Sequence, residues 1–420
     1  MASNAAGIRA VTEEEFPRWL EALRAGFLHS QEISEEEIRV RREAVVLERT
    51  LGAFEPDGRC TATFRTLPQR LTVPGGARVD SLAVTNVTVL PTHRRRGLLT
   101  RMMRRALAEG RERGDACSTL DAAQYPIYGR YGYGPAAWAT EWTVDSARAG
   151  LDPRWSRPEE EGARIDLAGA EEFRALGAEL HERVCALPDR QGMTDRTERW
   201  WRLRTGGIDW PGRDPARPFH ALYRDAGGRV QGLLAYTADE NWENNAPRVN
   251  ARVRDLIAAT AAAERALWHF LLSLDWVATV HSGPRAPDSL LPLLLPDPRA
   301  ARTTSHTDFL WLRPLDVPAL LAARTYPVPG SLVLELADPM GLSGGRFLLD
   351  ASPDGAACTP TTRSADLSMG VGALGSLYLG DESASRLREL GLLEEERPGA
   401  AALADVLLRT ARRPWAPDEF

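Results

Sequence analysis

The sequence of 420 residues contains no lysine, so all 52 of its basic residues are arginines. It has only four cysteines, which lie far apart at positions 60, 117, 185 and 358. None of them forms a Cys-x-x-Cys pair, which argues against a zinc site and against a disulfide framework. The sequence therefore predicts no metal site.

Long hydrophobic runs are lacking as well. No stretch reaches the roughly 20 apolar residues that are needed to cross a bilayer. Near the N-terminus, Glu13, Glu14 and Glu15 stand where a signal peptide needs an apolar run. These two absences predict a cytoplasmic protein without a membrane span.

The charges of the two signs nearly balance. The chain has 58 acidic and 52 basic residues, for a formal net charge of −6. General attraction to nucleic acid or to an anionic membrane is therefore not expected, and a cationic substrate is favoured. With 43% hydrophobic and 26% charged residues the composition is that of a globular protein. Its length exceeds one ordinary core and predicts two or three domains.

What the sequence does have is a strand that passes through an arginine-rich turn into a helix. Residues 86–99 read Asn-Val-Thr-Val-Leu-Pro-Thr-His-Arg-Arg-Arg-Gly-Leu-Leu. The alternating valines suit a strand, which Pro91 ends because proline has no N–H to donate. Beyond Gly97, apolar residues recur every three or four positions as far as residue 110, as they do on one face of a helix.

Such a turn favours a bound anion. The unpaired amides and the dipole of a helix's first turn attract negative charge, and Gly97 lets a ligand approach the backbone. An arginine run alone is usually a solvated face or a general anion patch. Two common nucleotide signatures, a loop ending in Gly-Lys-Ser/Thr and Gly-x-Gly-x-x-Gly after a strand, are both absent. The strand and helix around the turn nevertheless predict a pyrophosphate site.

The turn resembles the acetyl-CoA pyrophosphate loop of the GNAT acetyltransferases, Arg/Gln-x-x-Gly-x-Gly/Ala. It matches at Arg94 and Gly97, whereas Leu99 stands where a second small residue is usual. Residues 127–135 read Ile-Tyr-Gly-Arg-Tyr-Gly-Tyr-Gly-Pro, and the chain ends in Glu-Phe. Together these features resemble the Eis (enhanced intracellular survival) family of N-acetyltransferases. Two less specific stretches, residues 301–304 and 375–380, are also similar to that family.

The resemblance covers nearly the whole chain and implies an α/β (α+β) fold in three parts. These are a GNAT domain at residues 1–150, a degenerate GNAT-like domain at 164–300 and a sterol-carrier-protein-like domain at 303–420. The patterns of the first part suit a mixed sheet with helices packed against it. Besides the strand and helix around the arginine turn, we expect a helix at 14–27, strands at 49–54, 59–65, 69–73, 77–80 and 116–120, turns at 55–58 and 74–76, and a linker at 152–161.

The second part repeats the strand-helix-strand order of the first. We expect a helix at 168–187, a hairpin turn at 225–228, a strand at 248–256, a helix at 259–274 and a strand at 276–280. Residues 258–260 stand where the arginine turn would be, so this half is predicted not to hold a pyrophosphate. In the third part we expect a helix at 317–323, strands at 331–336 and 346–349, and a turn at 352–355. Its apolar strands are typical of a core and do not by themselves indicate lipid binding.

Acetyl transfer to an amine needs a free amine, a proton donor for the departing thiolate and dipoles that stabilise the oxyanion. Removing a proton from a lysine-like ammonium, with a pKa of about 10.4, costs roughly 4 to 5 kcal/mol at about pH 7. A buried carboxylate relieves that cost by accepting the proton. The Eis resemblance implies that this carboxylate is the main-chain one of Phe420 and that Tyr128 donates a proton to the thiolate.

Each role has a physical requirement. An α-carboxyl with a pKa of about 3.5 needs burial to become a better base, and the ring of Phe420 is a suitable anchor. A tyrosine holds its proton more tightly than a thiol, by roughly 2 kcal/mol, so a strong hydrogen bond from Tyr128 can suffice. Tyr125, Tyr131 and Tyr133 compete for the role, and only the family motif selects Tyr128. A tyrosine in such a turn is most often a packed aromatic, and a C-terminus is most often frayed.

For the acetyl-CoA cosubstrate, we expect the pantetheine arm to pair as an added strand with the end of the strand before Pro91. A backbone amide of that strand is also the natural oxyanion donor. His93 lies among arginines, which disfavour its charged form and suit a structural or solvated role. The predicted cofactor-binding residues are Val87, Val89, Arg94, Arg95, Gly97 and Leu98.

The resemblance implies an acidic acceptor pocket lined with aromatics, as in family members that modify aminoglycosides. Glu419 matches an acidic position beside the terminus. His29 stands where an acidic residue is expected, and Asn86 stands where an aromatic one is expected. We predict that Glu419, His29 and Asn86 border the acceptor, and both departures argue against strong binding of polycationic aminoglycosides.

The sequence thus predicts an acetyl-CoA-dependent N-acetyltransferase. It moves an acetyl group to a primary amine (an aminoglycoside, a polyamine-like small molecule or a lysine) by direct attack in a ternary complex. The alternative is a non-catalytic protein that binds acyl-CoA or lipid through the same loop. The resemblance also implies a homohexamer. Because the chain lacks lysine, its own nitrogen acetylation is limited to the N-terminal amine.

Overall fold

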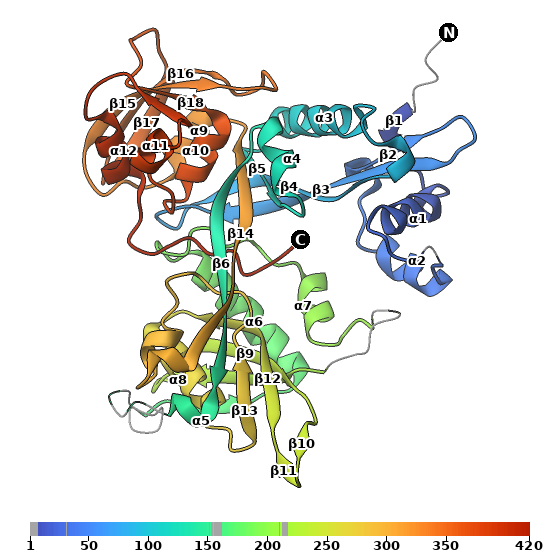
Figure 1. Ribbon diagram of the computed structural model, residues 1–420, viewed down its shortest axis with the longest axis vertical. Coiled ribbons are helices and arrows are strands. Elements are labelled where there is room, and N and C mark those ends of the chain that lie inside the picture. Colours follow the sequence, from blue (N-terminus) through green and yellow to red (C-terminus); the bar gives the residue numbers. More distant parts are fainter. Residues whose placement is uncertain are drawn as a thin grey trace.

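The computed structural model describes residues 7–30, 32–150, 152, 154, 162–209, 211 and 217–420. Within them the chain forms one sheet of twelve strands, one of five and a short two-stranded ribbon (Figure 1). The largest sheet runs through the first and second parts, and the five-stranded sheet lies in the third. Most of the predicted linker at residues 152–161 lies outside the described residues.

The first part of the large sheet has five strands in the order β1-β2-β3-β4-β5. Turns form at both predicted positions: the N–H of Gly58 donates to the Glu55 carbonyl over 2.9 Å, and that of Gly76 donates to the Val73 carbonyl over 3.0 Å. The strands are β1 (Gly7–Ala10), β2 (Thr50–Phe54), β3 (Cys60–Thr72), β4 (Arg78–Val89) and β5 (Cys117–Asp121).

The structure has two long strands where the sequence predicted four short ones. The predicted strands at 59–65 and 69–73 are both part of β3, although Pro68 lies between them. β2 pairs with β3 only as far as Arg65, so one edge of β3 has no neighbouring strand at Pro68. A strand tolerates proline at such an edge. The strand at 77–80 and the strand before Pro91 likewise form a single β4.

Helices cover both faces of this half-sheet. The predicted helix at 14–27 is α1 (Phe16–Gly26), and the helix after the arginine turn is α3 (Leu98–Arg113). Figure 1 shows them on opposite sides of β3 and β4. A side chain at Gly26 would collide with that of Thr88 at 2.4 Å, so α1 approaches β4 closely and faces Thr88. Val87 and Val89 pack against the cluster that includes the apolar face of α3.

Two long strands join the halves of the large sheet. β14 (Ala301–Pro314) lies between β5 and β6 (Gly134–Asp145), and β6 also pairs with β13 (Val277–His281). Leu310 of β14 is therefore paired with Asp121 on one side and with Ala137 on the other. Figure 1 shows β6 and β14 crossing from one half of the molecule to the other.

The second part confirms the predicted order of elements. Its hairpin turn is closed by a hydrogen bond of 2.8 Å from the Gly228 N–H to the Asp225 carbonyl. Beyond β13 the sheet continues in the order β12-β9-β8-β7. The elements are β7 (Arg164–Leu167), α6 (Ala170–Cys185), α7 (Glu198–Arg204), β8 (Phe219–Arg224), β9 (Val230–Ala238), β12 (Val249–Ala258) and α8 (Ala261–Leu272), with the separate ribbon β10 (Trp242–Glu243) and β11 (Ala246–Pro247).

The third part holds the predicted helix and both predicted strands. Its sheet has the order β17-β16-β15-β18-β19. Its apolar core is continuous with Cys117, Ala137 and Leu312 of the large sheet, so the first and third parts share one core. The elements are α9 (Val317–Ala323), β15 (Gly330–Ala337), β16 (Gly345–Ser352), β17 (Gly355–Pro360), β18 (Leu367–Gly370), α10 (Val371–Tyr378), α11 (Ala384–Glu389), β19 (Leu393–Glu395) and α12 (Ala400–Leu408).

Close backbone contact and one ion pair fix the third part onto the large sheet. A side chain at Gly375 of α10 would lie 2.2 Å from the carbonyl oxygen of Leu312, so only glycine fits there. Arg313 of β14 donates to Asp338 over 2.8 Å, and both side chains are fully buried. Although burial alone raises it, hydrogen bonds from Arg313 and nearby main-chain amides bring the pKa of Asp338 down to about 2.

Two further features concern the cysteines and the apolar helices. All four cysteines are buried and unpaired. Among the described residues, no helix is both long enough and apolar enough to span a membrane. The boundaries predicted at 150, 164, 300 and 303 stay predictions.

Substituting Gly375→Ala should destabilise the protein. The added methyl group meets the Leu312 carbonyl, and overpacking of this kind typically costs about 1 to 3 kcal/mol. Gly169→Ala is the control, because a methyl group there meets nothing within 4 Å. Thermal unfolding monitored by circular dichroism measures both. Equal midpoints for the two variants would contradict the docking described for α10.

Candidate active site

The arginine turn has the backbone of an open anion cradle. A short 3-10 turn (Pro91–His93) follows β4, and Arg95 and Gly97 then adopt φ angles of 60° and 74°. Gly97 precedes α3 without a side-chain cap, so the first-turn amides of α3 have no side-chain acceptor there. A side chain at Gly97 would meet nothing within 4 Å. Space is therefore open directly above the helix start.

The side chains of the turn differ in what they can reach. Arg94, Arg95 and Arg96 are exposed, and Arg96 donates to the Thr92 carbonyl over 3.0 Å. Leu98 is buried in the core, so only its main chain faces the cradle. His93 is buried, with its ring 3.5 Å from the Glu55 carboxylate and 2.8 Å from the Thr92 hydroxyl. The His93 ring is therefore held by these two neighbours.

The corresponding place in the second half is closed. There the hydroxyl of Thr260 caps α8 by accepting from the Ala263 N–H over 3.1 Å. Arg190 donates to the Ala258 carbonyl at the end of β12. This helix start offers fewer free groups to an anion than that of α3, which is a physical reason for the prediction that this half holds no pyrophosphate.

β4 and β5 separate beside the cradle. They pair in parallel only over residues 81–84 and 117–120. From Thr85 to Val89, β3 is the strand that pairs with β4 in the described chain, so the other edge of β4 has no partner strand there, although the Arg94 side chain donates to the Val89 carbonyl over 3.3 Å. Asn86 lies at an irregularity in this pairing with a φ of 52°, and its carbonyl accepts from the Thr63 hydroxyl. An open strand edge of this kind can pair with an extended ligand.

Tyr128 ends α4 (Tyr125–Tyr128) and is buried, with its ring edge-on to that of Tyr133. Burial raises the pKa of Tyr128 to about 12, so the hydroxyl keeps its proton at neutral pH. The hydroxyls of Tyr131 and Tyr133 are engaged by Thr100 and Ser118. Tyr125 is exposed and packs edge-on against Trp311. Among the described residues, no group is hydrogen-bonded to the Tyr128 hydroxyl.

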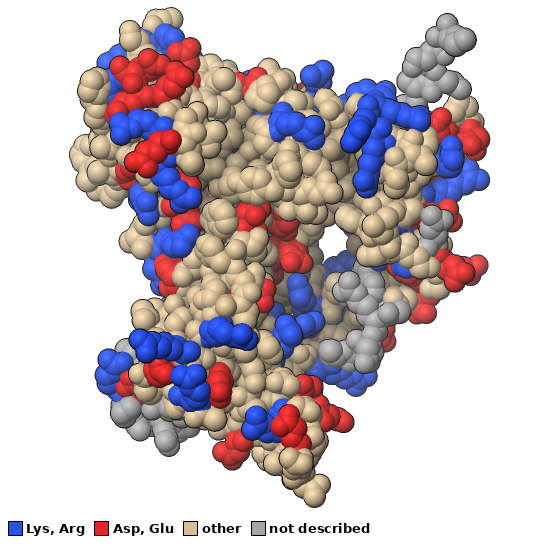
Figure 2. Space-filling model, in the orientation of Figure 1, with Lys and Arg blue, Asp and Glu red and all other residues tan. Residues whose placement is uncertain are grey.

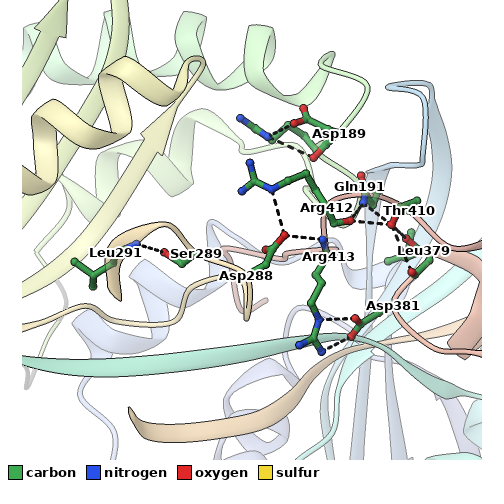
Figure 3. A network of polar contacts seen from close by, with 12 residues as sticks. Asp189, Gln191, Asp288, Ser289, Leu291, Leu379, Asp381, Thr410, Arg412 and Arg413 are labelled. Atoms are coloured by element: carbon green, nitrogen blue, oxygen red, sulfur yellow. Dashed lines mark hydrogen bonds and ion pairs between the residues drawn. The ribbon is translucent and has the colours of Figure 1, made fainter. Parts of the chain in front are cut away.

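The C-terminal tail, residues 411–420, is anchored to the rest of the protein at several points. Figure 3 shows the first anchors, where Arg412 and the Arg413 N–H both bond Asp288, and the Arg413 guanidinium binds Asp381. Asp288 lies beyond β13 in the second part and Asp381 lies beyond α10 in the third. Gln191 donates to the main chain of Arg412 over 2.6 Å. The tail is thus fastened to two parts of the molecule at once.

A buried arginine holds the tail closer to its end. Arg196 donates to Asp418 and to Asp255 of β12, each over 2.8 Å, and lies 3.8 Å above the ring of Trp200. Although burial alone lowers it, the two carboxylates raise the pKa of the Arg196 guanidinium. Two residues further on, the half-buried ring of Phe420 packs against the shared core.

Beside the tail lies an acidic pocket. It has a volume of about 350 Å³ and is lined by the carboxylates Asp121, Glu141, Asp308 and Glu419, which come from β5, β6, β14 and the tail. Figure 2 shows acidic side chains in the middle of the face where Figure 1 places the C-terminus. Burial, with repulsion from Glu419, raises the pKa of Asp121 to about 8.

Of the three predicted acceptor residues, one lines the acidic pocket and two do not. Glu419 lines the acidic pocket. Neither His29 nor Asn86 does: His29 is exposed beyond α1, and Asn86 lies on β4. Asp121, Glu141 and Asp308 were not predicted from the sequence. They stand on three strands that are distant in sequence, so only the pairing of those strands reveals the cluster.

Comparison with known proteins shows which families this chain resembles. Residues 7–136 and residues 192–314 each match a family model described as an acetyltransferase (GNAT) domain. Residues 317–417 match a sterol carrier protein domain. An uncharacterized N-acetyltransferase of Streptomyces avermitilis is 54% identical over 98% of this chain and 98% of its own. The predicted fold class is confirmed.

The N-acetyltransferase Eis of Mycobacterium tuberculosis is 36% identical over 81% of this chain and 83% of its own length. The chain belongs to the Eis family of N-acetyltransferases. Eis1 from Mycobacterium abscessus, whose crystal structure has been solved, is 33% identical to this chain in sequence. The structural match covers 99% of this chain and 100% of the Eis1 chain, with a TM-score of 0.83. The predicted enzyme class, a GNAT-superfamily N-acetyltransferase, is confirmed, and GNAT acetyltransferases take their acetyl group from acetyl-CoA.

Replacing Arg196 by Met should lower the free energy of unfolding of this Eis-family protein, because Arg196 holds the C-terminal tail. The change leaves Asp255 and Asp418 buried without their cation, which typically costs about 3 to 5 kcal/mol. The control is Arg148→Met, since the pair of Arg148 with Asp297 is exposed and such pairs are worth about 0 to 1 kcal/mol. Urea unfolding distinguishes them, and similar midpoints would show that the Arg196 network contributes little.

Proposed function

We propose that the chain moves the acetyl group of acetyl-CoA to a primary amine, by direct attack in a ternary complex. The observation that carries this proposal is the acidic pocket, which borders the chain terminus and the end of β5 in a family that acetylates nitrogen. The carboxylates of Glu141, Asp308 and Glu419 around one pocket attract a cationic amine, since like charges on the walls concentrate a ligand of opposite charge. A small polyamine-like molecule or a lysine side chain has that charge.

Acetyl-CoA fits the cradle and the open edge of β4. The main-chain amides at Gly97 and Leu98 and the side chains of Arg94 and Arg95 surround the pyrophosphate. The backbones of Val87 and Val89 pair with the pantetheine arm along the edge that β5 leaves free. A main-chain N–H on the same edge stabilises the developing oxyanion.

Two groups move protons. The terminal carboxylate of Phe420 accepts a proton from the ammonium of the acceptor, directly or through water. The free hydroxyl of Tyr128 donates a hydrogen bond or a proton to the thiolate that leaves. Because burial raises the pKa of Tyr128 to about 12, this group serves as a donor and not as a base at neutral pH. The homohexamer and the cytoplasmic location expected from the sequence stay predictions.

Thiol release from acetyl-CoA in the presence of polyamines, aminoglycosides and lysine-containing peptides tests the function. We expect thiol release that depends on at least one amine, and the panel identifies the class of acceptor. Absence of amine-dependent release throughout the panel would favour the alternative, a protein that binds acyl-CoA or lipid without catalysis.

Tyr128→Phe should lower kcat by about 10² or more, the usual contribution of a proton donor, while acetyl-CoA binding is unchanged. Tyr131→Phe is the matched control, because the Tyr131 hydroxyl already bonds Thr100. Extending the chain beyond Phe420 should have an effect as large as Tyr128→Phe. The mechanism fails if both the Tyr128 variant and the extended chain turn over normally.

The charge of the pocket gives another prediction. Glu141→Gln should raise the KM for a cationic acceptor about fivefold, which corresponds to ~1 kcal/mol, with little change in kcat. The effect should shrink as salt screens the pocket. Glu112→Gln, an exposed site on α3, is the control. A KM that does not respond to Glu141→Gln at low salt would place the acceptor elsewhere.

A further inference from the structure

Asp121 occupies an unusual place between the acidic pocket and the tail. It is the last residue of β5 and it lines the pocket. Both of its carboxyl oxygens are buried, and neither has a hydrogen-bond partner among the described residues. Leaving a buried polar group unpaired costs about 1 to 3 kcal/mol. A hydrogen-bond donor that reaches the Asp121 carboxyl therefore removes this cost.

The donor beside this carboxyl belongs to the end of the chain. The main-chain N–H of Phe420 is close enough to the Asp121 carboxyl to lower its pKa, although the two do not meet the distance and angle of a hydrogen bond. The other charged groups around Asp121 are acidic: Glu419 and Asp418 on the tail, Glu141 on β6 and Asp308 on β14. Of these, Asp418 is already bound by Arg196.

We propose that Asp121 is a positioning residue, which binds the main-chain N–H of Phe420 and so sets where the terminal carboxylate lies at the acidic pocket. This inference rests on the proposed function and adds to it the group that places the base. Arg196 fixes the tail two residues earlier, at Asp418, and the ring of Phe420 packs against the shared core, but neither contact holds the main chain of Phe420. An anchor at the Phe420 N–H holds that main chain as well.

The charge state of Asp121 suits this task. Burial and the carboxylate of Glu419 raise the pKa of Asp121 to about 8, so at pH 7 the carboxyl is largely neutral. A neutral carboxyl accepts the N–H of Phe420 without repelling the terminal carboxylate. As the pH rises through about 8, Asp121 ionises and repels Glu419 of the tail. The N–H of Phe420 favours the ionised form and lowers the pKa of Asp121, but the repulsion from Glu419 raises that pKa by more, so ionisation weakens the hold on the tail as a whole at higher pH.

Two substitutions at Asp121 separate the effect of the hydrogen bond from the effect of the ionisation. Asp121→Asn keeps an oxygen that accepts the N–H and removes the ionisation. Asp121→Ala removes both. The first measurement is the release of phenylalanine from the full chain by carboxypeptidase A between pH 7 and pH 9, normalised to a short peptide that ends in phenylalanine. Thermal unfolding shows whether each variant is folded.

At pH 7 we expect Asp121→Ala to release phenylalanine about tenfold faster than the wild type, and Asp121→Asn to match the wild type, because one hydrogen bond is worth up to about a factor of ten. Toward pH 9 the wild type should lose its protection, whereas Asp121→Asn should keep it. Equal release from all three proteins, or an identical pH dependence in the wild type and Asp121→Asn, would overturn the proposal.

Turnover gives a second measurement. The ratio of kcat/KM for Asp121→Asn to that of the wild type cancels the titration of the acceptor amine. We expect this ratio to be flat below pH 7 and to rise severalfold by pH 9. For Asp121→Ala we expect a loss in kcat with little change in the KM of the amine. A higher KM together with unchanged phenylalanine release would make Asp121 an acceptor ligand and overturn its positioning role.

The two measurements keep the inference separate from the proposed function. Phenylalanine release does not depend on catalysis, so it tests the anchor even if no amine is acetylated. If amine-dependent thiol release is absent while Asp121→Ala still exposes the terminus, the proposed function fails and the contact stands. If turnover is present and the terminus is equally protected in every variant, the proposed function stands and the inference fails.

Discussion

A single buried guanidinium constrains where this chain can end. Arg196 lies between Asp255 on β12 and Asp418 near the terminus, with the ring of Trp200 against its face. Burying a carboxylate is costly unless a cation and hydrogen bonds compensate, and here one arginine compensates two. The tail therefore follows one path across the second part, and the acidic pocket acquires a wall from Glu419.

Burial affects two of the proposed site residues, Tyr128 and Asp121, in related ways. Burial makes the Tyr128 hydroxyl hold its proton more tightly, and it makes the Asp121 carboxyl hold a proton that an exposed aspartate would lose. At Asp121 this effect leaves a neutral group in the wall of a pocket that also contains three other carboxyl groups. The site thus combines a negative wall for binding with neutral groups at its buried edges. That combination suits an amine that enters as an ammonium and must react as a free base.

The sequence predicted those helices and turns well whose signals lie within a few neighbouring residues. The proline and glycine around the arginine turn, the tight turns and the helical periodicities depend on neighbours in sequence, and the structure places them as expected. Strand lengths were underestimated, because Pro68 looks like a break until one knows that its edge has no partner strand. The merging of strands at 77–80 and before Pro91 has the same origin: pairing with β3 extends β4 beyond its own apolar pattern.

The acidic pocket is where prediction from sequence alone fell short. Glu419 was identified through the family resemblance, whereas Asp121, Glu141 and Asp308 carry no motif. Their proximity follows from the position of β14 between β5 and β6, which no local pattern encodes. Conversely, His29 and Asn86 were nominated by their place in the sequence, and the folded chain keeps both off the walls of the pocket.

The placement of β14 also has a consequence for how the chain is made. Strands β5 and β6 are complete after residue 145, yet the strand that fills the gap between them begins only at Ala301. A nascent chain that emerges from the ribosome in order must keep the edge of β5 and both edges of β6 without their partner strands while most of the second part is being synthesised. Bare edges of this kind invite pairing with other chains. Biogenesis of this protein is therefore expected to depend on chaperones, and fragments cut between the first two parts are expected to aggregate.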